Sequence, residues 1–464
     1  MVFSSFSFLF LFLPVVLAVY FILPGIKAKN AVLCLFSLLF YAWGEPVCIL
    51  LMLLSILVNY GIGIGMERFP GRKKALLILA LAVNLGAIGY FKYSDFLISN
   101  LNRIPGIRLP LTGAVLPIGI SFYTFQILSY VIDVYRGQSR AQRDLLSLAT
   151  YISLFPQLVA GPIVRYETVK NELRSRTVTR QDFAEGLSRF LFGLGKKVLI
   201  ANQMARGADA VFNAADQPGG WVIWLGALLY TMQIYFDFSG YSDMAIGMGR
   251  MFGFHFLENF NYPYTAASVT DFWRRWHMSL SSWFREYVYI PLGGNRRGTA
   301  RQIVNILTVW LLTGLWHGAN WNYILWGLFY GGLLILEKFA LKRALPHIPG
   351  LVRRVAVFII VMVGWVIFRV EDLSALGGAL GRMFSFRGGD VGAFLTAHAD
   401  ALVSLVLLPA ALLGCFPWWK RLAARFAETG WFPVLRMTAA LAVWLGSVAL
   451  LLGESYNPFI YFQF

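Results

Sequence analysis

Charged residues are scarce in this chain. Only 14% of its 464 residues are Asp, Glu, Lys or Arg, whereas 58% are hydrophobic. Soluble domains carry about 25% charged residues, so the composition excludes a soluble globular protein. The sequence has no long polar stretch that could form a separate soluble domain. It also lacks the alternation of apolar and polar residues that builds an outer-membrane barrel. We therefore predict an all-α, polytopic membrane protein.

Cysteine and histidine are also rare. The three cysteines lie in or beside apolar runs and have no metal-ligand spacing, which argues against a disulfide framework and against a metal site. Of the five histidines, His277 and His317 stand in aromatic surroundings interrupted by glycine. A buried imidazole there would be neutral, and it could take a proton from a hydroxyl group. The alternative for each is a structural role, in which the buried histidine donates a hydrogen bond to a backbone carbonyl.

Two common catalytic motifs are missing. No G-x-S-x-G sequence is present, so a serine-hydrolase nucleophile is not expected. The sequence Gly195-Lys196-Lys197 lacks the upstream glycine and the hydroxyl residue of a phosphate-binding loop,. Neither serine hydrolysis nor nucleotide hydrolysis is therefore favoured.

The positive charge of the chain has an ordinary explanation. A net charge of +17 could indicate nucleic acid, but in a membrane protein basic residues collect in cytoplasmic loops. Such residues also hold anionic lipid or an anionic substrate such as a coenzyme. The basic loops at 27–29 and 68–74 alternate with the weakly charged turn at 44–46. We predict contact with membrane lipid, no nucleic-acid partner, and an N-terminus outside the cytoplasm.

Apolar runs recur along the whole sequence. We predict about 11 transmembrane helices plus half-helices, judged by length, in a single integral-membrane domain over residues 1–464. The N-terminal run has no basic segment or cleavage site and is interpreted as a retained helix. Two prolines and a glycine predict a broken helix at 148–163. The expected helical runs are 7–23, 31–41, 48–64, 75–90, 116–134, 148–163, 182–212, 220–234, 355–370, 401–416 and 437–452.

The stretch 303–336 is too long for one span and too short for two spans with a loop. His317 sits in its middle, near Gly314, Gly318 and Asn320. As a helix, residues 303–316 would cover roughly 21 Å, so a helix starting at one membrane face would end inside the bilayer. An ionisable residue at that depth is costly and indicates a functional site.

The segment 271–295 is too polar to span a membrane. At helical spacing, one face collects Trp273, His277, Leu280, Phe284 and Tyr287,. Another face collects an arginine- and serine-containing row, namely Arg274, Met278, Ser281 and Arg285. The pattern fits an amphipathic helix at the membrane interface. It also fits the wall of a funnel that leads a charged substrate inwards.

Two acidic residues, Asp237 and Asp243, lie among small residues. They could relay protons, although buried carboxylates more often pair with an arginine. From the residues alone, two classes of protein remain open. One is a transferase that uses a histidine base, and the other is a transporter that relays protons. Transporters usually carry paired repeats with matching broken helices, and the absence of such repeats favours the enzyme.

Two long motifs resemble the signature of membrane-bound O-acyltransferases. They are W-R-R-W-H-M-S-L-S with R-E-Y-V-Y-I-P-L-G-G-N over 273–295, and L-W-H-G-A-N-W over 315–321. The sequence is most similar to the bacterial alginate O-acetylation branch, which it also resembles at 1–5, 117–123 and 155–165. The resemblance covers the whole chain, with a motif core at approximately 115–336. It implies a ring of helices around a funnelled core.

The resemblance also implies a reaction and its participants. His317 would be the catalytic base and His277 an assisting residue. Substrate would contact Arg274, Arg275, Arg285, Ser281, Trp316, Asn320 and Trp321. The donor would be acetyl-CoA or an acyl carrier thioester, with no bound cofactor or metal. Expected partners are an extracytoplasmic SGNH or esterase-like acetyltransferase and a polysaccharide acceptor. The location would be the bacterial inner membrane. D-alanyl transfer to teichoic acid, or a transporter or flippase without enzyme activity, is the alternative.

Overall fold

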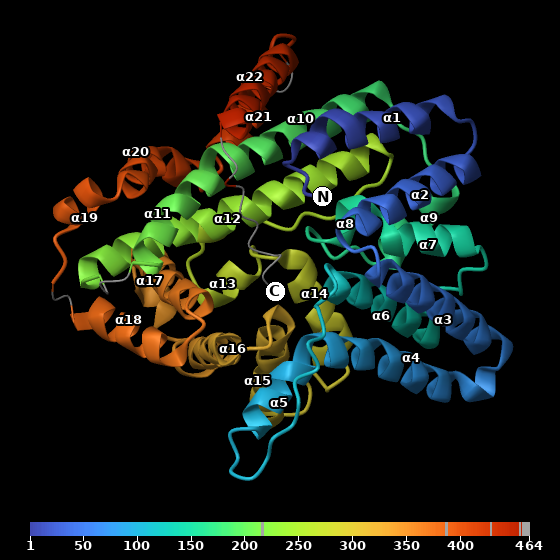
Figure 1. Ribbon diagram of the computed structural model, residues 1–464, viewed down its shortest axis with the longest axis horizontal. Helices are drawn as coiled ribbons and strands as arrows, with labels where there is room; N and C mark the ends of the chain where they lie inside the picture. Colours follow the sequence, from blue (N-terminus) through green and yellow to red (C-terminus); the bar gives the residue numbers. More distant parts are fainter. Residues whose placement is uncertain (215–217, 386–387, 427–428, 454–455, 457–464) are drawn as a thin grey trace. The chain divides into compact units, whose positions relative to one another are not determined.

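The computed structural model describes residues 1–214, 218–385, 388–426, 429–453 and 456 (Figure 1). Every element in these ranges is helical, which confirms the predicted all-α class. The chain divides into two compact units, residues 1–190 with 242–257 and residues 191–241 with 258–464. Two long helices, α10 (Arg180–Gly195) and α12 (Gly220–Met251), contribute residues to both units.

Unit 1 is built on packed apolar helices. α2 packs on α7, and α4 packs on both α3 and α6, as the blue and green ribbons of Figure 1 show. The helices of this unit are α1 (Leu13–Ile22), α2 (Ile26–Gly44), α3 (Cys48–Arg68), α4 (Lys73–Ile88), α5 (Ser94–Leu101), α6 (Ile120–Arg136), α7 (Leu145–Ser153), α8 (Phe155–Leu158) and α9 (Tyr166–Arg174).

The predicted break near Pro156 is present. α7 ends at Ser153, and α8 is a single turn that begins at Phe155 with Pro156 in its first turn. The freed backbone is covered by protein, because residues 155–164 are all buried. The Ser37 hydroxyl accepts a hydrogen bond from the Phe155 N–H at 3.0 Å. Buried partners of this kind are what allow irregular backbone at membrane depth.

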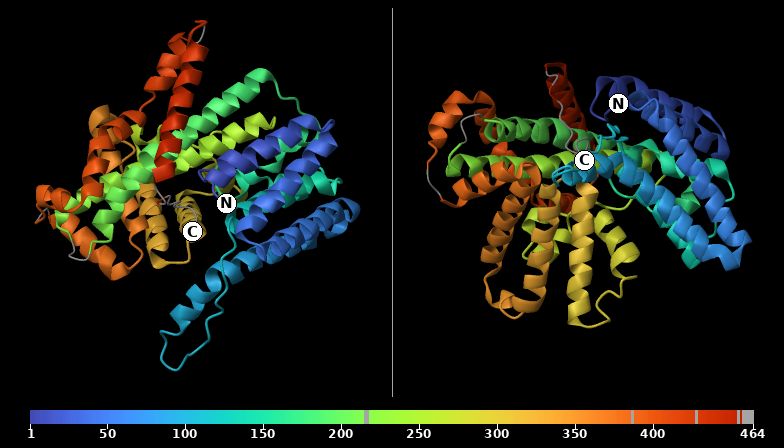
Figure 2. Two further views of the ribbon diagram at one scale, coloured as in Figure 1. Left: turned by 45° about the horizontal axis from the view of Figure 1, so that its top comes forward. Right: turned by 60° about the horizontal axis from the view of Figure 1, so that its bottom comes forward.

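Unit 2 contains both candidate histidines. Its helices, apart from the parts of α10 and α12, are α11 (Asn202–Phe212), α13 (Val269–Trp273), α14 (Met278–Phe284), α15 (Thr299–His317), α16 (Trp321–Ile335), α17 (Gly350–Arg369), α18 (Leu373–Ser385), α19 (Val391–Ala397), α20 (Ala399–Gly414), α21 (Trp418–Phe426) and α22 (Phe432–Gly453). α15 and α16 form an antiparallel hairpin, and α16 also packs on α13 and α17 (Figure 2).

Six helical segments of the described chain are long and apolar enough to cross a membrane, or seven if the bent pair α19–α20 is one span. They are residues 26–44, 48–68, 70–101, 321–340, 350–369 and 432–453. The chain is thus a multi-pass membrane protein, while a total near 11 spans stays a prediction. Other helices carry buried polar groups; α6, for example, has 17 residues and includes Gln126, Ser129 and Asp133.

Candidate active site

His317 is the last residue of α15. Gly318 follows in an extended conformation, and Asn320 then caps α16 by accepting a hydrogen bond from the Trp321 N–H at 2.6 Å. Asparagine is among the preferred residues at a helix N-cap, so the local sequence explains why one helix ends and the next begins here. α15 starts at Thr299, four residues before the expected start. It covers about 28 Å and is therefore longer than the short inner helix that we predicted.

Glycines allow α15 and α16 to approach closely. A Cβ atom at Gly314 would lie 2.3 Å from the Tyr323 carbonyl oxygen, and one at Gly327 would lie 2.3 Å from the Trp310 carbonyl oxygen. No real side chain tolerates these distances. Small residues are the usual means of close helix packing in membranes. The two glycines thus fix the hairpin at whose turn His317 lies.

Aromatic rings surround the His317 imidazole. The ring centroids of Trp316, Trp326 and Phe368 lie 4.9, 5.0 and 5.2 Å from that of His317, all edge to face. Only 5% of His317 is exposed. A neutral imidazole ring is the form that can accept a proton from a hydroxyl group.

His277 lies at a sharp break between α13 and α14. Its φ and ψ angles are 44° and 54°, a left-handed conformation that is uncommon for a residue other than glycine. A single amphipathic helix through this segment is therefore not what forms. The predicted aromatic row, Trp273, His277, Leu280, Phe284 and Tyr287, is buried. In the predicted basic row, Arg274 and Arg285 are exposed and Met278 and Ser281 are half-buried.

Asn259 holds the His277 side chain. The Asn259 Oδ1 atom lies 3.1 Å from His277 Nδ1 and accepts hydrogen bonds from the Ser279 N–H at 3.3 Å and the Ser279 hydroxyl at 2.8 Å. The Asn259 carbonyl oxygen accepts from the Met278 N–H at 3.0 Å. His277 is 1% exposed, and burial lowers its pKa to about 3,. The ring is therefore neutral at physiological pH.

Trp316 links the two histidines. Its ring is 5.9 Å from that of His277 and 4.9 Å from that of His317, centroid to centroid. Phe238 of α12 also packs on His277, with its ring centroid 4.7 Å from that of the imidazole. Both predicted catalytic residues thus belong to one buried aromatic cluster in unit 2.

Glu337 connects the segment that contains His277 (residues 269–284, α13 and α14) to the hairpin of α15 and α16 that contains His317. It lies just beyond α16, and its two carboxylate oxygens accept hydrogen bonds from the N–H groups of Val269 and Thr270 at 2.7 and 3.1 Å. These N–H groups belong to the first turn of α13, where a negative charge is favourable. The short helix that precedes His277 is therefore anchored on α16.

The remaining predicted substrate residues divide by exposure. Arg274 and Arg285 are exposed, whereas Arg275 is ion-paired with Asp271 at 2.8 Å. Trp316 is buried, and Trp321 is 39% exposed. The Ser281 hydroxyl donates to the Trp273 carbonyl oxygen at 3.3 Å. Asn320 acts as the cap of α16, as described above. Their contacts with substrate stay a prediction.

The two carboxylates of α12 are paired. Asp243 binds Arg189 in unit 1, with Nη2–Oδ1 at 2.9 Å. Asp237 binds Lys197 in unit 2 at 2.5 Å, and both side chains are at most 3% exposed. The structural alternative is thereby confirmed for both, although Asp237 has a lysine partner in place of the expected arginine.

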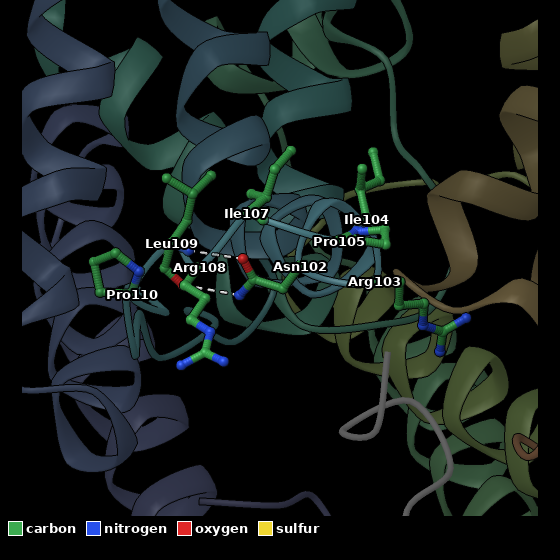
Figure 3. Close-up of a pocket in the computed structure, with 9 residues that line it drawn as sticks. Asn102, Arg103, Ile104, Pro105, Ile107, Arg108, Leu109 and Pro110 are labelled. Atoms are coloured by element: carbon green, nitrogen blue, oxygen red, sulfur yellow. Dashed lines mark hydrogen bonds between the residues drawn. The ribbon is translucent and has the colours of Figure 1, made fainter.

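A surface hollow lies elsewhere, in the loop that follows α5 (Figure 3). It is lined by residues 102–110. Asn102 closes this loop, because its amide accepts from the Leu109 N–H at 2.7 Å and donates to the Leu109 carbonyl at 2.9 Å. None of the predicted site residues lines it, so it is not the candidate active site.

Sequence reasoning missed Asn259 and Ser279. The segment 259–264, N-F-N-Y-P-Y, has a composition that is typical of a turn,. The Asn261 N–H donates to the Arg275 carbonyl oxygen at 2.9 Å, so this turn contacts the chain just before the break at His277. Two asparagines within three residues, Asn259 and Asn261, in an otherwise apolar chain are the one signal that could have drawn attention to it.

The fold and the site together define a polytopic helical membrane protein with two buried histidines, His317 on a glycine-packed hairpin and His277 at the break between α13 and α14. Residues 134–368 match the membrane-bound O-acyltransferase family, and this match includes both histidines. The chain belongs to that family, as its motifs suggested, and it is an O-acyltransferase.

Similar proteins align over different shares of the chain. A probable alginate O-acetylase from Pseudomonas putida is 42% identical, with both proteins covered completely. A peptidoglycan O-acetyltransferase from Helicobacter pylori is 36% identical over 84% of this chain and 80% of its own length. A teichoic acid D-alanyltransferase from Bacillus subtilis is 31% identical over 48% of this chain and 59% of its own length.

Proposed function

We propose that this protein transfers an acetyl group from a cytoplasmic thioester towards an extracytoplasmic polysaccharide, across the bacterial inner membrane. The observation that carries the proposal is the position of His317, buried among Trp316, Trp326 and Phe368 at the end of α15. The full-length similarity to a probable alginate O-acetylase supports acetyl as the group and an exopolysaccharide such as alginate as the acceptor.

His317 acts as the general base in this proposal. Its neutral imidazole takes the proton of an acceptor hydroxyl as the oxygen attacks the thioester carbonyl. A C–O ester bond forms, the C–S bond breaks, and the proton passes to the departing thiolate. His277 orients or shares that proton. The cluster needs no metal for this sequence of steps, because an imidazole supplies the acid–base chemistry itself.

The exposed charge supports the proposed donor, and the family resemblance implies the proposed partner. Arg274 and Arg285 are exposed on the His277 segment and can hold the phosphates of acetyl-CoA or of a carrier-protein cofactor. The acetyl group is then handed to an SGNH or esterase-like acetyltransferase outside the cytoplasm, which places it on the polymer. A ring of about 11 helices around a funnel would bring the two substrates together.

His317→Ala tests the proposal. General base catalysis contributes about 10²–10⁴-fold, so acetyl-thioester turnover by the purified variant should fall by that factor while its size-exclusion profile stays normal. His255 offers a matched control, because its side chain is 59% exposed and paired with Glu172 in unit 1. His255→Ala should keep full turnover. Full turnover in a well-folded His317→Ala protein would refute the role of His317.

D-alanyl transfer to teichoic acid is the second candidate, favoured by the partial match to the Bacillus subtilis enzyme. Purified protein offered acetyl-CoA, acetyl carrier protein and D-alanyl carrier protein separately would discriminate these donors. Turnover of the acetyl donors alone supports the proposal, and turnover of the D-alanyl donor alone overturns it.

A further inference from the structure

We propose that Asn259 is the positioning residue of His277, fixing the ring tautomer in which Nδ1 carries the hydrogen and Nε2 exchanges the proton. The inference rests on the proposed function only for the use made of Nε2. The tautomer itself is a separate property of the molecule. Asn259 is 1% exposed and precedes His277 by 18 residues in the chain.

The orientation of the Asn259 amide is settled by a backbone group. The Ser279 N–H can only donate, and the Asn259 atom 3.3 Å from it must therefore be the oxygen, Oδ1,. The amide oxygen is an acceptor only. Because the same Oδ1 lies 3.1 Å from His277 Nδ1, this nitrogen carries a hydrogen. A neutral imidazole has one N–H, so the lone pair is on Nε2.

Ser279 does not offer an alternative donor for Nδ1. Its hydroxyl lies 2.8 Å from Asn259 Oδ1 and 3.4 Å from His277 Nδ1. A hydroxyl has a single hydrogen, and the shorter contact to the amide oxygen is the better hydrogen bond. Without a hydrogen on Nδ1, two lone pairs would face each other across 3.1 Å in a buried place.

The same asparagine also holds the strained backbone of His277. Its own carbonyl oxygen accepts from the Met278 N–H at 3.0 Å, directly after the left-handed residue. A left-handed conformation is unfavourable for a residue other than glycine and persists when its surroundings over-determine it. Asn259 supplies one such constraint through its main chain and another through its side chain.

Three variants separate positioning from mere packing. Asn259→Leu removes the acceptor, whereas Asn259→Asp keeps an acceptor at the same place and adds a negative charge. Asn305→Leu is the matched control, because Asn305 is also a fully buried asparagine of unit 2 and donates to the Gly294 carbonyl at 2.9 Å, away from His277. All three are purified and compared by thermal unfolding.

The first measurement is the ¹⁵N spectrum of histidine-labelled protein, in which His277 is assigned from its loss in His277→Gln. Wild type and Asn259→Asp should show the tautomer protonated on Nδ1, and so should Asn305→Leu. Asn259→Leu should show a mixture or the opposite tautomer. An unchanged Nδ1–H tautomer in a folded Asn259→Leu protein would overturn the proposal, whatever the activity.

The second measurement is the pH profile of thioester turnover. A carboxylate beside Nδ1–H favours the charged ring, so Asn259→Asp should raise the pKa of His277 and shift the acid limb of the profile to higher pH. Asn305→Leu should leave that limb unmoved. If Asn259→Asp also leaves it unmoved, Asn259 has no positioning role in the reaction. Full activity of both histidine variants would instead refute the proposed function and leave the tautomer assignment standing.

Discussion

The indole of Trp316 and the imidazole of His277 meet edge to face, with their ring centroids 5.9 Å apart. The next residue along the chain is His317, so one tryptophan contacts both histidines. The two histidines lie in different parts of the chain, His277 between α13 and α14 and His317 at the end of α15, yet both contact the Trp316 ring. A substitution of either histidine therefore changes the packing of the same aromatic ring.

This arrangement predicts coupling between the histidines. His317→Ala and His277→Gln should each lower thioester turnover, with the larger loss at His317. The double variant should lose little more than His317→Ala alone, because residues that act as one unit give non-additive losses. Turnover rates of the four proteins form the double-mutant cycle. Losses that simply multiply would show that the histidines act independently.

The arginines of the His277 segment should differ in function. Arg274→Gln and Arg285→Gln should raise the KM for acetyl-CoA by about tenfold, because a hydrogen bond to a charged group is worth about 1.5–3 kcal/mol. Arg275→Gln should change KM less, since Arg275 is already paired with Asp271. Its effect on unfolding should stay within about 1 kcal/mol. If all three variants had the KM of the wild-type protein, the arginines would have no role in donor binding.

The hairpin glycines should be sensitive to a single methyl group. Gly314→Ala would place a Cβ atom 2.3 Å from a backbone oxygen, and overpacking of this kind costs about 1–3 kcal/mol or more. The unfolding midpoint and the turnover should both fall. Gly332→Ala in α16 is the control, because a Cβ atom there meets nothing within 4 Å. It should be neutral or slightly stabilising, as alanine is the better helix former.

The orientation of the chain can be tested by labelling. In unit 1 the basic loops near 68–74 and 136–143 lie at the same end, because Glu67 accepts from the Ala141 N–H at 2.7 Å and is ion-paired with Arg143 at 3.5 Å. The positive-inside rule places this end in the cytoplasm. In intact cells, Arg103→Cys should react with an impermeant maleimide and Arg140→Cys only after permeabilisation. The opposite pattern would invert the topology.

The sequence predicted the helices of this fold better than their ends. Apolar runs such as 48–64 and 355–370 were confirmed as α3 and α17, because burial in lipid leaves a strong compositional signal. The end of α15 at His317 followed from Gly318 and Asn320. The start of α15 was placed four residues late, because the polar residues Thr299, Arg301 and Gln302 continue the helix outside the apolar run.

The candidate site was predictable in its residue types but not in its backbone. The burial of His277 and the exposure of Arg274 agree with the predicted rows, although no single helix joins the two residues. The left-handed break at His277 was not predicted, since the groups around it hydrogen-bond to Asn259, which lies 18 residues earlier in the chain. Long-range constraints of this kind leave no local pattern. For the same reason, the sequence could indicate that Asp237 has a basic partner, but it could not identify Lys197 as that partner.

The carboxylate of Glu337 gives the site a thermodynamic connection as well as a geometric one. The amide N–H groups of Val269 and Thr270 donate hydrogen bonds to this carboxylate. These amide hydrogens can exchange with solvent deuterium only when α13 separates from the end of α16. Local openings differ widely in free energy within one protein. Exchange at these two amides therefore reports directly on how often the His277 segment leaves the hairpin that carries the proposed base.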